Sequence, residues 1–486
     1  MISELKNALK RVATVASMLL LGALVPVASL AESRCEGSGA LLVRDVRVLD
    51  LAGEAPATSD HMNVLIRDGA VVAIGPDSGA QAPDDVCHLD GRGRTLMPGL
   101  VDMHVHIWDE AELGAYIGHG VTTVRNLSGM PFLLEMRDRV ATGELLGPRI
   151  VTSGPILNGP GPNAQINHQI VETAEEARAA VRAQHAAGYR RLKVYSNLSR
   201  EAYEAIRDEA ETLGMPITGH TPEGVREPGM PFERPFNIAF EELLDDGFET
   251  IEHVESIVWH GLRERYDEEA ARALAHRIAE AGVPVDPTLI AFANLYRTAE
   301  SRGAYLERPG TNMLNPFISA MEEPMFERWR SEDADRAREQ LAFFSRFTAQ
   351  LQQEGAMLVA GSDSGIFTNI PGASLHDELA LLVEAGLTPY QALRAATYNA
   401  AVVLGEAETV GRVAPGYRAD LILVAGDPLA DIGLVREPAA VIANGNLLTA
   451  GGIAIMLESA EQPSAERTQR NVLAAMAAQG SEVPAE

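Results

Sequence analysis

His104 and His106 stand two residues apart at the end of an apolar run that begins at Gly99. Alternate residues of a β-strand point to the same side, so both imidazoles could reach one metal ion. Two histidines at this spacing also occur by chance in a core or on a surface. The pair therefore predicts a metal site only if further ligands come to the same place.

Four more side chains that can bind metals or transfer protons also close short apolar runs. They are Lys193, His220, His253 and Asp363. Each has an ordinary alternative, since Lys193 could be a solvated charge, His253 a core histidine beside Glu252, and Asp363 the cap of the next turn. Coincidence is a poor explanation for all six positions together, and the set predicts a metal centre.

The runs that end in these residues alternate with helical patterns, which is typical of β-α-β units around a parallel sheet. Eight such runs favour a closed (β/α)8 barrel over an open doubly wound sheet. Barrel active sites form at the carboxyl ends of the strands, so this α/β fold would bring the six side chains together. The predicted strands span 99–104, 121–125, 150–153, 191–195, 216–220, 250–253, 283–286 and 357–363.

Local signals place several helices between these runs. A Ser or Thr followed three residues later by Glu or Gln can form a capping box, in which both side chains satisfy free N–H groups. Ser199 can likewise cap a helix that stops at Gly214, because glycine accepts the left-handed conformation that often follows a helix. The predicted capping boxes are Thr173 with Glu176 and Thr388 with Gln391.

The barrel would occupy residues 98–406, with further segments on both sides. Short β-rich runs over 38–97 return over 407–457, so the two segments predict one small β-sandwich domain. The long helical interval 287–355 follows the seventh strand and should form a lid or substrate wall at the catalytic face. Residues 458–486 are polar and Ala-rich, which predicts a C-terminal tail with a surface helix or a frayed end.

Residues 1–31 have the order of a cleaved signal peptide, with basic residues, an apolar run and a small-residue exit. The mature protein is then expected in the periplasm or outside the cell, with no stable membrane anchor. A retained anchor is the alternative, although the run 12–24 is shorter than the roughly 20 residues that a span needs. In an oxidising compartment Cys35 and Cys87 could form a disulfide or stay as two buried thiols.

The composition limits the class of partner. The chain of 486 residues is 46% hydrophobic, which is ample for one large domain and a small satellite. Its net charge of −28, from 68 acidic and 40 basic residues, disfavours broad attraction to nucleic acid or anionic lipid. The expected partners are small molecules, and a homo-oligomer is left open.

The motifs around these positions resemble the metal-dependent amidohydrolase superfamily, in its imidazolonepropionase-like and prolidase-like branch. The resemblance covers nearly all of the chain after the predicted signal peptide. It implies a (β/α)8 metallohydrolase barrel. The motifs lie at 98–106, 120–126, 193–195, 219–220, 252–253, 286–289, 361–363, 386–389, 396–397 and 411–420.

The resemblance implies two divalent metal ions, with zinc as the expected element, and an activated hydroxide that attacks an amide carbonyl. Asp363 would act as the general base and then as the general acid. Mononuclear members of the branch lack the bridging lysine, so Lys193 favours two ions. The implied ligands are His104, His106 and Asp363 for the first ion, His220 and His253 for the second, and carbamylated Lys193 for both.

Substrate contacts are less determined than ligands. Tyr195 should face the same mouth and could bond a substrate carbonyl, or it could fill the rim, and His168 is a further candidate contact. Asn126 stands where relatives often have Asp, and 158–161 carries Asn-Gly-Pro-Gly in place of Gly-Gly-His. These departures leave the identity of the substrate open.

Export and two metals favour cleavage of an amide bond in a dipeptide or an N-acyl amino acid. Arg328 and Arg330 of the long interval could pair with the carboxylate of such a substrate, although arginines of this kind usually face water. Opening of a cyclic amide is the alternative, and Lys193 disfavours deamination of a ring. A catalytically silent metal-binding barrel is the non-enzymatic hypothesis.

Overall fold

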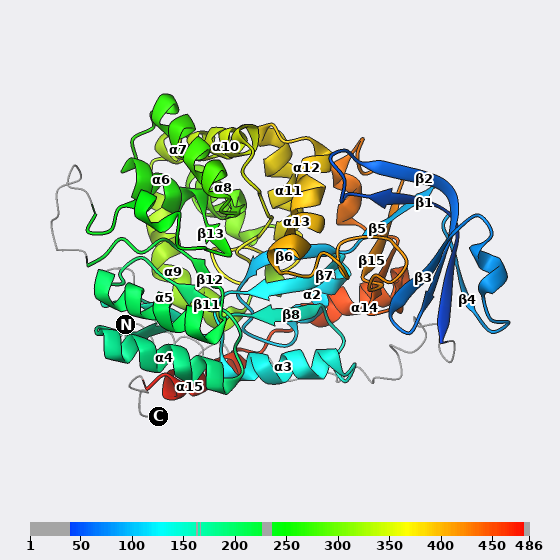
Figure 1. The fold of residues 1–486 in the computed structure, drawn as a ribbon, viewed down its shortest axis with the longest axis horizontal. Helices are drawn as coiled ribbons and strands as arrows, with labels where there is room; N and C mark the ends of the chain where they lie inside the picture. Colours follow the sequence, from blue (N-terminus) through cyan, green and yellow to red (C-terminus); the bar gives the residue numbers. More distant parts are fainter. Residues whose placement is uncertain (1–38, 162–163, 166, 226–235, 481–486) are drawn as a thin grey trace.

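A computed structural model describes residues 39–161, 164–165, 167–225 and 236–480 of the chain. In Figure 1 a sheet-rich end, drawn in blue and orange, adjoins a larger body in which strands and helices alternate. The predicted signal peptide over 1–31 and the predicted disulfide partner Cys35 lie outside the described residues. Within those ranges, no helix combines the length and the apolar character needed to span a bilayer.

One eight-stranded sheet joins segments from the two ends of the described chain. Its strands run in the order β17-β16-β15-β5-β1-β2-β3, and β4 pairs with β1. The two segments meet where β15 pairs with β5 in antiparallel orientation, with Ile422 opposite Met97, and both side chains are fully buried. The strands are β1 (Ala40–Asp50), β2 (Ala57–Arg67), β3 (Ala70–Gly75), β4 (Cys87–Asp90), β5 (Arg94–Pro98), β15 (Leu421–Ala425), β16 (Ala440–Ala443) and β17 (Asn446–Thr449).

The larger body contains two parallel sheets whose short strands are nearly all buried on both faces, as expected of strands covered by helices. They overlap seven of the eight predicted runs. The first sheet has β6 (Leu100–Val105), β7 (Val121–Asn126) and β8 (Arg149–Thr152). The second has the order β10-β9-β11-β12-β13-β14, with β9 (Ile156–Asn158), β10 (His168–Ile170), β11 (Leu192–Val194), β12 (Ile217–Gly219), β13 (Thr250–Glu252) and β14 (Val285–Asp286).

Backbone hydrogen bonds link the two parallel sheets. The eighth predicted run, 357–363, forms no regular strand, but it bonds to β14 on one side and to β6 on the other. A further bond connects the segment after β8 to the start of β11. The linking bonds are Gly154 N to Arg191 O (3.0 Å), Val285 N to Met357 O (2.9 Å) and Met103 N to Ala360 O (2.9 Å).

Helices begin and end where the local signals indicate. Both predicted capping boxes are confirmed, at the first turns of α4 and α12. Ser199 caps α5, and Gly214 ends it in the left-handed conformation with φ of 64°. The helices of the body are α2 (Glu112–Gly118), α3 (Pro131–Ala141), α4 (Ala174–Ala187), α5 (Arg200–Leu213), α6 (Val254–Leu262), α7 (Glu268–Ala281), α11 (Ala373–Ala385), α12 (Pro389–Ala395) and α13 (Tyr398–Val403).

The long interval after β14 is largely helical, as the sequence predicts. It forms α8 (Leu289–Glu300), α9 (Pro316–Ser331) and α10 (Ala334–Glu354). Helices α8 and α10 pack through Phe292 and Phe344, whose ring centroids lie 5.3 Å apart. The start of α8 is fixed to α11, because the buried Glu378 carboxylate accepts the backbone N–H of Ile290 at 2.7 Å.

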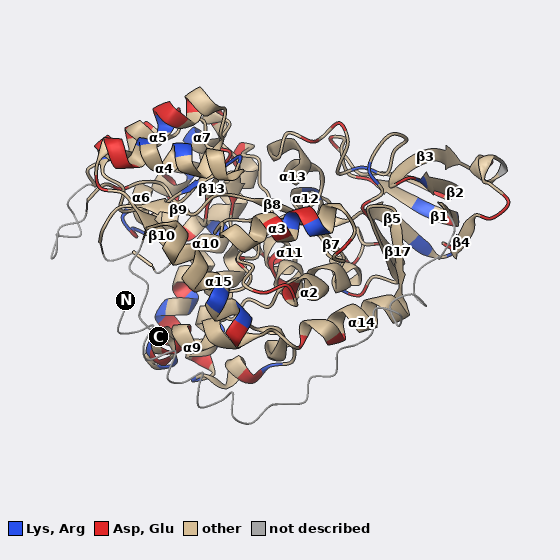
Figure 2. Ribbon diagram, turned by 90° about the horizontal axis from the view of Figure 1, so that it is seen from below, with Lys and Arg blue, Asp and Glu red and all other residues tan. Residues whose placement is uncertain are grey.

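Negative charge is distributed over the helices, as the red segments on α3, α5 and α9 in Figure 2 show. Much of it is neutralised in ion pairs. Arg328 lies 3.3 Å from Glu332, and Arg330 lies 2.8 Å from Glu323. The two arginines considered as partners of a substrate carboxylate are therefore occupied by carboxylates of the protein itself.

The chain continues through α14 (Ala450–Ala460) and α15 (Ala465–Ala478), drawn in orange and red in Figure 1. Helix α15 is attached to the segment that follows His106. Arg467 forms two hydrogen bonds with Asp109, at 2.7 and 2.6 Å, and Asn471 donates to the carbonyl of Trp108 at 3.1 Å. Val472 of the same helix is 2% exposed. This helix is therefore packed against the body and is not a frayed end.

Replacing Arg467 with alanine is expected to lower the free energy of unfolding by about 2 kcal/mol, because the buried Asp109 carboxylate loses its only side-chain cation among the described residues. Urea denaturation measures the change. Arg470→Ala on the same helix is the control, since Arg470 pairs with the exposed Glu466 and should matter much less. Equal losses in both variants would contradict this account of α15.

Candidate active site

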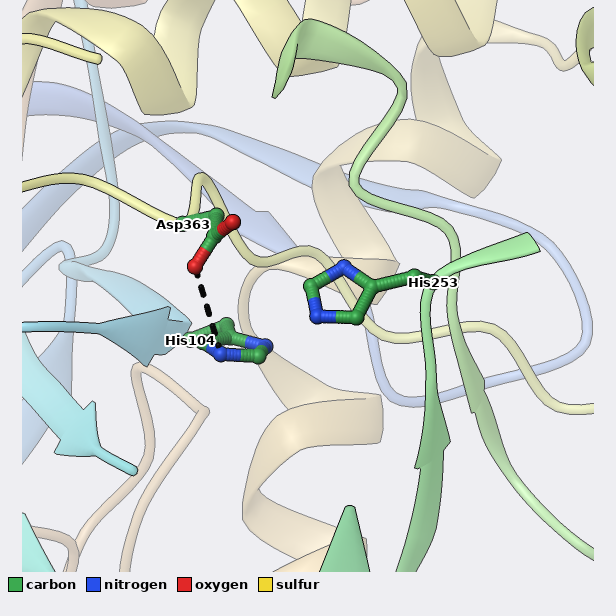
Figure 3. Close-up of side chains that lie close together, drawn as sticks. All are labelled: His104, His253 and Asp363. Atoms are coloured by element: carbon green, nitrogen blue, oxygen red, sulfur yellow. Dashed lines mark ion pairs between the residues drawn. The ribbon is translucent and has the colours of Figure 1, made fainter. Parts of the chain in front are cut away.

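The six predicted side chains meet at the carboxyl ends of the parallel strands. Figure 3 shows His104, His253 and Asp363 facing a common space, with the ion pair between His104 and Asp363 marked. Lys193 Nζ lies 3.5 Å from His104 Nε2. The ring centroids of His104 and His106 are 5.3 Å apart, those of His104 and His253 are 4.7 Å apart, and those of His220 and His253 are 4.6 Å apart.

Each of the four histidines is held by its Nδ1 atom. A side chain bonded to that atom fixes the orientation of the ring and leaves Nε2 for a ligand. The partners come from separate segments, namely β13, the loop after β7, α6 and the residue before α8, so the rings are fixed by the fold. The pairs are His104 with Glu252 (2.9 Å), His106 with Ser128 (2.8 Å), His220 with Ser256 (2.9 Å) and His253 with Thr288 (2.5 Å).

Burial controls the protonation of the site. It lowers the pKa of His104 and His220 well below the usual value and that of His253 to about 4, so these imidazoles are neutral near pH 7. Neutral imidazole is the form that binds metals. Burial also lowers the pKa of Lys193 to about 8, against the opposing charges of Glu252 and Asp363.

Two of the six residues adopt strained backbone conformations. The φ angles of His253 and Asp363 are 66° and 52°, and Thr288, which holds His253, has φ of 48°. Residues other than glycine rarely adopt these φ angles. Such backbone strain persists where surrounding contacts enforce it, as at active sites. Just before Asp363, Gly361 admits no side chain, because a Cβ atom there would collide with Asp286 and His104.

Glu252 supports the site from below and was not predicted as a functional residue. Its carboxylate accepts hydrogen bonds from His104, from the fully buried Arg125 (2.9 Å) and from Thr218 (2.6 Å). Burial alone would raise the pKa of Glu252, but Arg125 and His104 hold it well below its usual value. An ionised carboxylate behind His104 makes that imidazole a stronger ligand. In the sequence, the position of Glu252 directly before the candidate ligand His253 was the one feature that pointed to a role at the site.

A cavity of about 270 Å³ opens above these residues. Tyr195 and His168, the two predicted substrate contacts, both line it, with ring centroids 4.7 Å apart, and Tyr195 lies 4.0 Å from His220 by the same measure. Gln165, Asn167, Glu255 and Glu322 add further polar groups. The apolar lining is Trp108, Ile156, Ala291, Phe292, Leu295, Ile318, Met321, Ile366, Phe367 and Val472.

Sequence reasoning identified none of the apolar lining residues. The lining residues of α8 and α9 lie in the interval 287–355, which the sequence assigns to the catalytic face. The sequence thus indicated this part of the wall but not which of its residues line the cavity. Val472 lies more than a hundred residues after Asp363 and belongs to no motif. Its place in the wall depends on how α15 packs.

The donor set fits a divalent ion. Ligand atoms of His104, His253 and Asp363 all lie within 4.8 Å of one another, and all three side chains are buried. Asp363 Oδ1 lies 3.0 Å from His106 Nε2, yet among the described residues it accepts no well-oriented hydrogen bond. Imidazole nitrogens with a carboxylate oxygen are the ligands that zinc and related ions prefer.

Comparison with known proteins gives matches along most of the chain. A family model described as the amidohydrolase family matches residues 95–448. Ochratoxinase of Aspergillus niger is 36% identical over 114 residues, which is 22% of this chain and only 23% of that protein's length.

Solved structures match over a longer span. The structure described as AH, bottromycin amidohydrolase, is 25% identical with a TM-score of 0.72, over 91% of this chain and 95% of that one. A Xaa-Pro dipeptidase is 21% identical with a TM-score of 0.61, over 85% and 100%. The chain therefore shares its fold with these proteins.

Proposed function

The chain belongs to the amidohydrolase family, and on that premise we propose that it is a binuclear metal-dependent enzyme that cleaves an amide bond in a dipeptide or an N-acyl amino acid. The observation that carries the proposal is the meeting of four oriented histidines, one buried lysine and one buried aspartate at the floor of a cavity. The description of one structural relative as a Xaa-Pro dipeptidase supports a linear, peptide-like substrate.

The metal ions would be divalent, with zinc as the expected element. When bound, such a pair lowers the pKa of a shared water and polarises the substrate carbonyl. The proposed ligands are His104, His106 and Asp363 for one ion, His220 and His253 for the other, and carbamylated Lys193 for both.

Two observations support carbamylation of Lys193. The Nζ atom is buried 3.5 Å from His104 Nε2, where an ammonium group would repel a metal, and its lowered pKa favours the neutral amine that reacts with carbon dioxide. The chain has only three lysines, and the other two, Lys6 and Lys10, lie in the predicted signal peptide. Apart from Lys193, the Lys and Arg residues after residue 31 are all arginines, and their guanidinium groups stay protonated.

Asp363 is the proposed proton carrier. Asp363 lines the cavity, and its Oδ1 atom has no well-oriented hydrogen-bond donor among the described residues, so the carboxylate could take a proton from the attacking water and deliver it to the leaving nitrogen. Tyr195 and His168 border the same space and are the proposed contacts with the substrate.

The proposal extends to the architecture and location. The bonds that link the parallel sheets support one (β/α)8 barrel over 98–406, and the shared eight-stranded sheet supports a β-sandwich domain from 38–97 and 407–457. Residues 458–486 would form the C-terminal tail that carries α15. Residues 1–31 would direct export to the periplasm or the outside and then be removed.

Metal removal tests the function. The protein without residues 1–31 is expected to contain two zinc equivalents and to hydrolyse members of a panel of dipeptides and N-acyl amino acids. A chelator should abolish hydrolysis, and added zinc should restore it. If the enzyme hydrolyses only lactams or imides, its substrate is a cyclic amide and not a dipeptide or an N-acyl amino acid. Bound metal without hydrolysis of any substrate would support the catalytically silent metal-binding barrel.

A further inference from the structure

Glu322 of α9 lines the cavity and has no cationic partner in the described part of the chain. Its two carboxylate oxygens accept the backbone N–H of Phe367, each at 3.2 Å. The neighbouring Glu323 points elsewhere and pairs with Arg330 at 2.8 Å. Of the two adjacent acids on α9, only Glu322 is directed to the space above the proposed metal site.

The wall around Glu322 is apolar, with Ile318, Met321 and Ile366 lining the cavity together with Phe367. A carboxylate in such surroundings lacks the solvation it would have in water. Burial accordingly raises the pKa of Glu322 to about 8. With that pKa, Glu322 is mostly protonated near pH 7 in the empty cavity, and a cation brought in by a ligand would favour its ionised form and pair with it.

The charged groups that line the described cavity outside the proposed metal ligands are both acidic. They are Glu322 and Glu255, and no arginine is among the described lining residues. Glu255 also accepts a hydrogen bond from Ser256 at 3.0 Å. Glu322 thus offers a receptor for positive charge next to a large apolar surface.

We propose that Glu322 recognises a cationic group of the substrate, so that the preferred amide carries a guanidinium or ammonium group beside an apolar body. This inference rests on the amide hydrolysis proposed for the same site. It assigns Glu322 as a specificity residue that contacts the substrate away from the scissile bond.

A structural role for Glu322 makes a different prediction. The segment it holds includes Phe367 and Thr368, with φ of 52° and 65°, and Asn369, which donates to the backbone carbonyl of Asp363 at 3.0 Å. If Glu322 served only to hold this segment, its replacement would change the cleavage of charged and neutral substrates by the same factor. Recognition of a cation changes their ratio.

Arginine and citrulline dipeptides separate these roles, because citrulline keeps the shape of arginine and replaces the guanidinium with a neutral urea. The substrates are Leu-Arg with Leu-citrulline and Arg-Leu with citrulline-Leu. In at least one pair, kcat/KM of the wild type is expected to favour arginine by about tenfold or more. Glu322→Gln should bring that ratio close to one, and Glu323→Gln should leave it unchanged.

A ratio near one in the wild type, or the same ratio in the wild type and Glu322→Gln, would overturn the inference. If the metal-loaded enzyme cleaves none of the dipeptides, the proposed function is at fault, and calorimetric binding of free arginine and citrulline gives the comparison without turnover. Tighter binding of arginine that disappears in Glu322→Gln would support the inference. Equal affinities in the wild type would refute it.

Discussion

Replacing Asp363 with asparagine is expected to lower kcat/KM by about a thousandfold or more, because the amide cannot accept a proton from water near neutral pH. The substitution keeps the size of the side chain, and the backbone bond from Asp363 N to His104 O (2.8 Å) is unaffected. The variant should therefore fold. Hydrolysis of the best substrate from the panel measures the loss, and metal analysis shows how much of it comes from weaker ion binding.

Asp267→Asn is the matched control for this variant. Asp267 caps α7 by accepting the N–H groups of Glu269 and Ala270, and asparagine caps helices about as well. Its activity should stay near that of the wild type. Activity of Asp363→Asn within tenfold of the wild type would place proton transfer on another group.

Replacing Lys193 with methionine is expected to reduce bound metal from two equivalents to one or fewer and to lower kcat/KM by at least about a hundredfold. Removing a group that only supports a metal ligand typically lowers metal affinity or activity by about tenfold to a hundredfold, and removing a bridging ligand should lower them further. Methionine is apolar and of similar length, so the buried site at β11 should tolerate it.

The single lysine after residue 31 makes the carbamate directly observable. Labelled bicarbonate should give one carbamate carbon signal in the wild type and none in Lys193→Met. Lys193→Glu, which supplies anionic oxygens without carbon dioxide, should recover part of the metal content. Two tightly bound ions and full activity in Lys193→Met would show that Lys193 is not a bridge.

The sequence predicted the strands and the position of the site because both depend on local patterns. Each candidate ligand closes its own apolar run, so a parallel arrangement of the runs suffices to bring His104 and Asp363 together. The capping boxes at Thr173 and Thr388 are local in the same sense, and the structure contains both. The run 357–363 forms an isolated bridge to β14 and backbone hydrogen bonds to β6 in place of a regular strand, and its own residues do not show how far such a ladder extends.

The cavity wall could not be predicted in the same way. Glu322 and Val472 reach the site through the packing of α9 and α15, which no short motif encodes. Arg328 and Arg330 lie on the same helix as Glu322, but they pair with other acids. The direction of a side chain on α9 depends on how the helix rotates against α8. Residue type alone therefore did not show which charged side chain of α9 lines the cavity.

The packing of α15 bears on when the enzyme becomes active during its synthesis. A nascent chain contains every proposed metal ligand once Asp363 has left the ribosome, but Val472 and Arg467 emerge much later. Until then the segment at Trp108 and Asp109 lacks its partner helix and the substrate space has an open side. The proposed hydrolysis would thus wait until the last helix has been made and has packed against this segment.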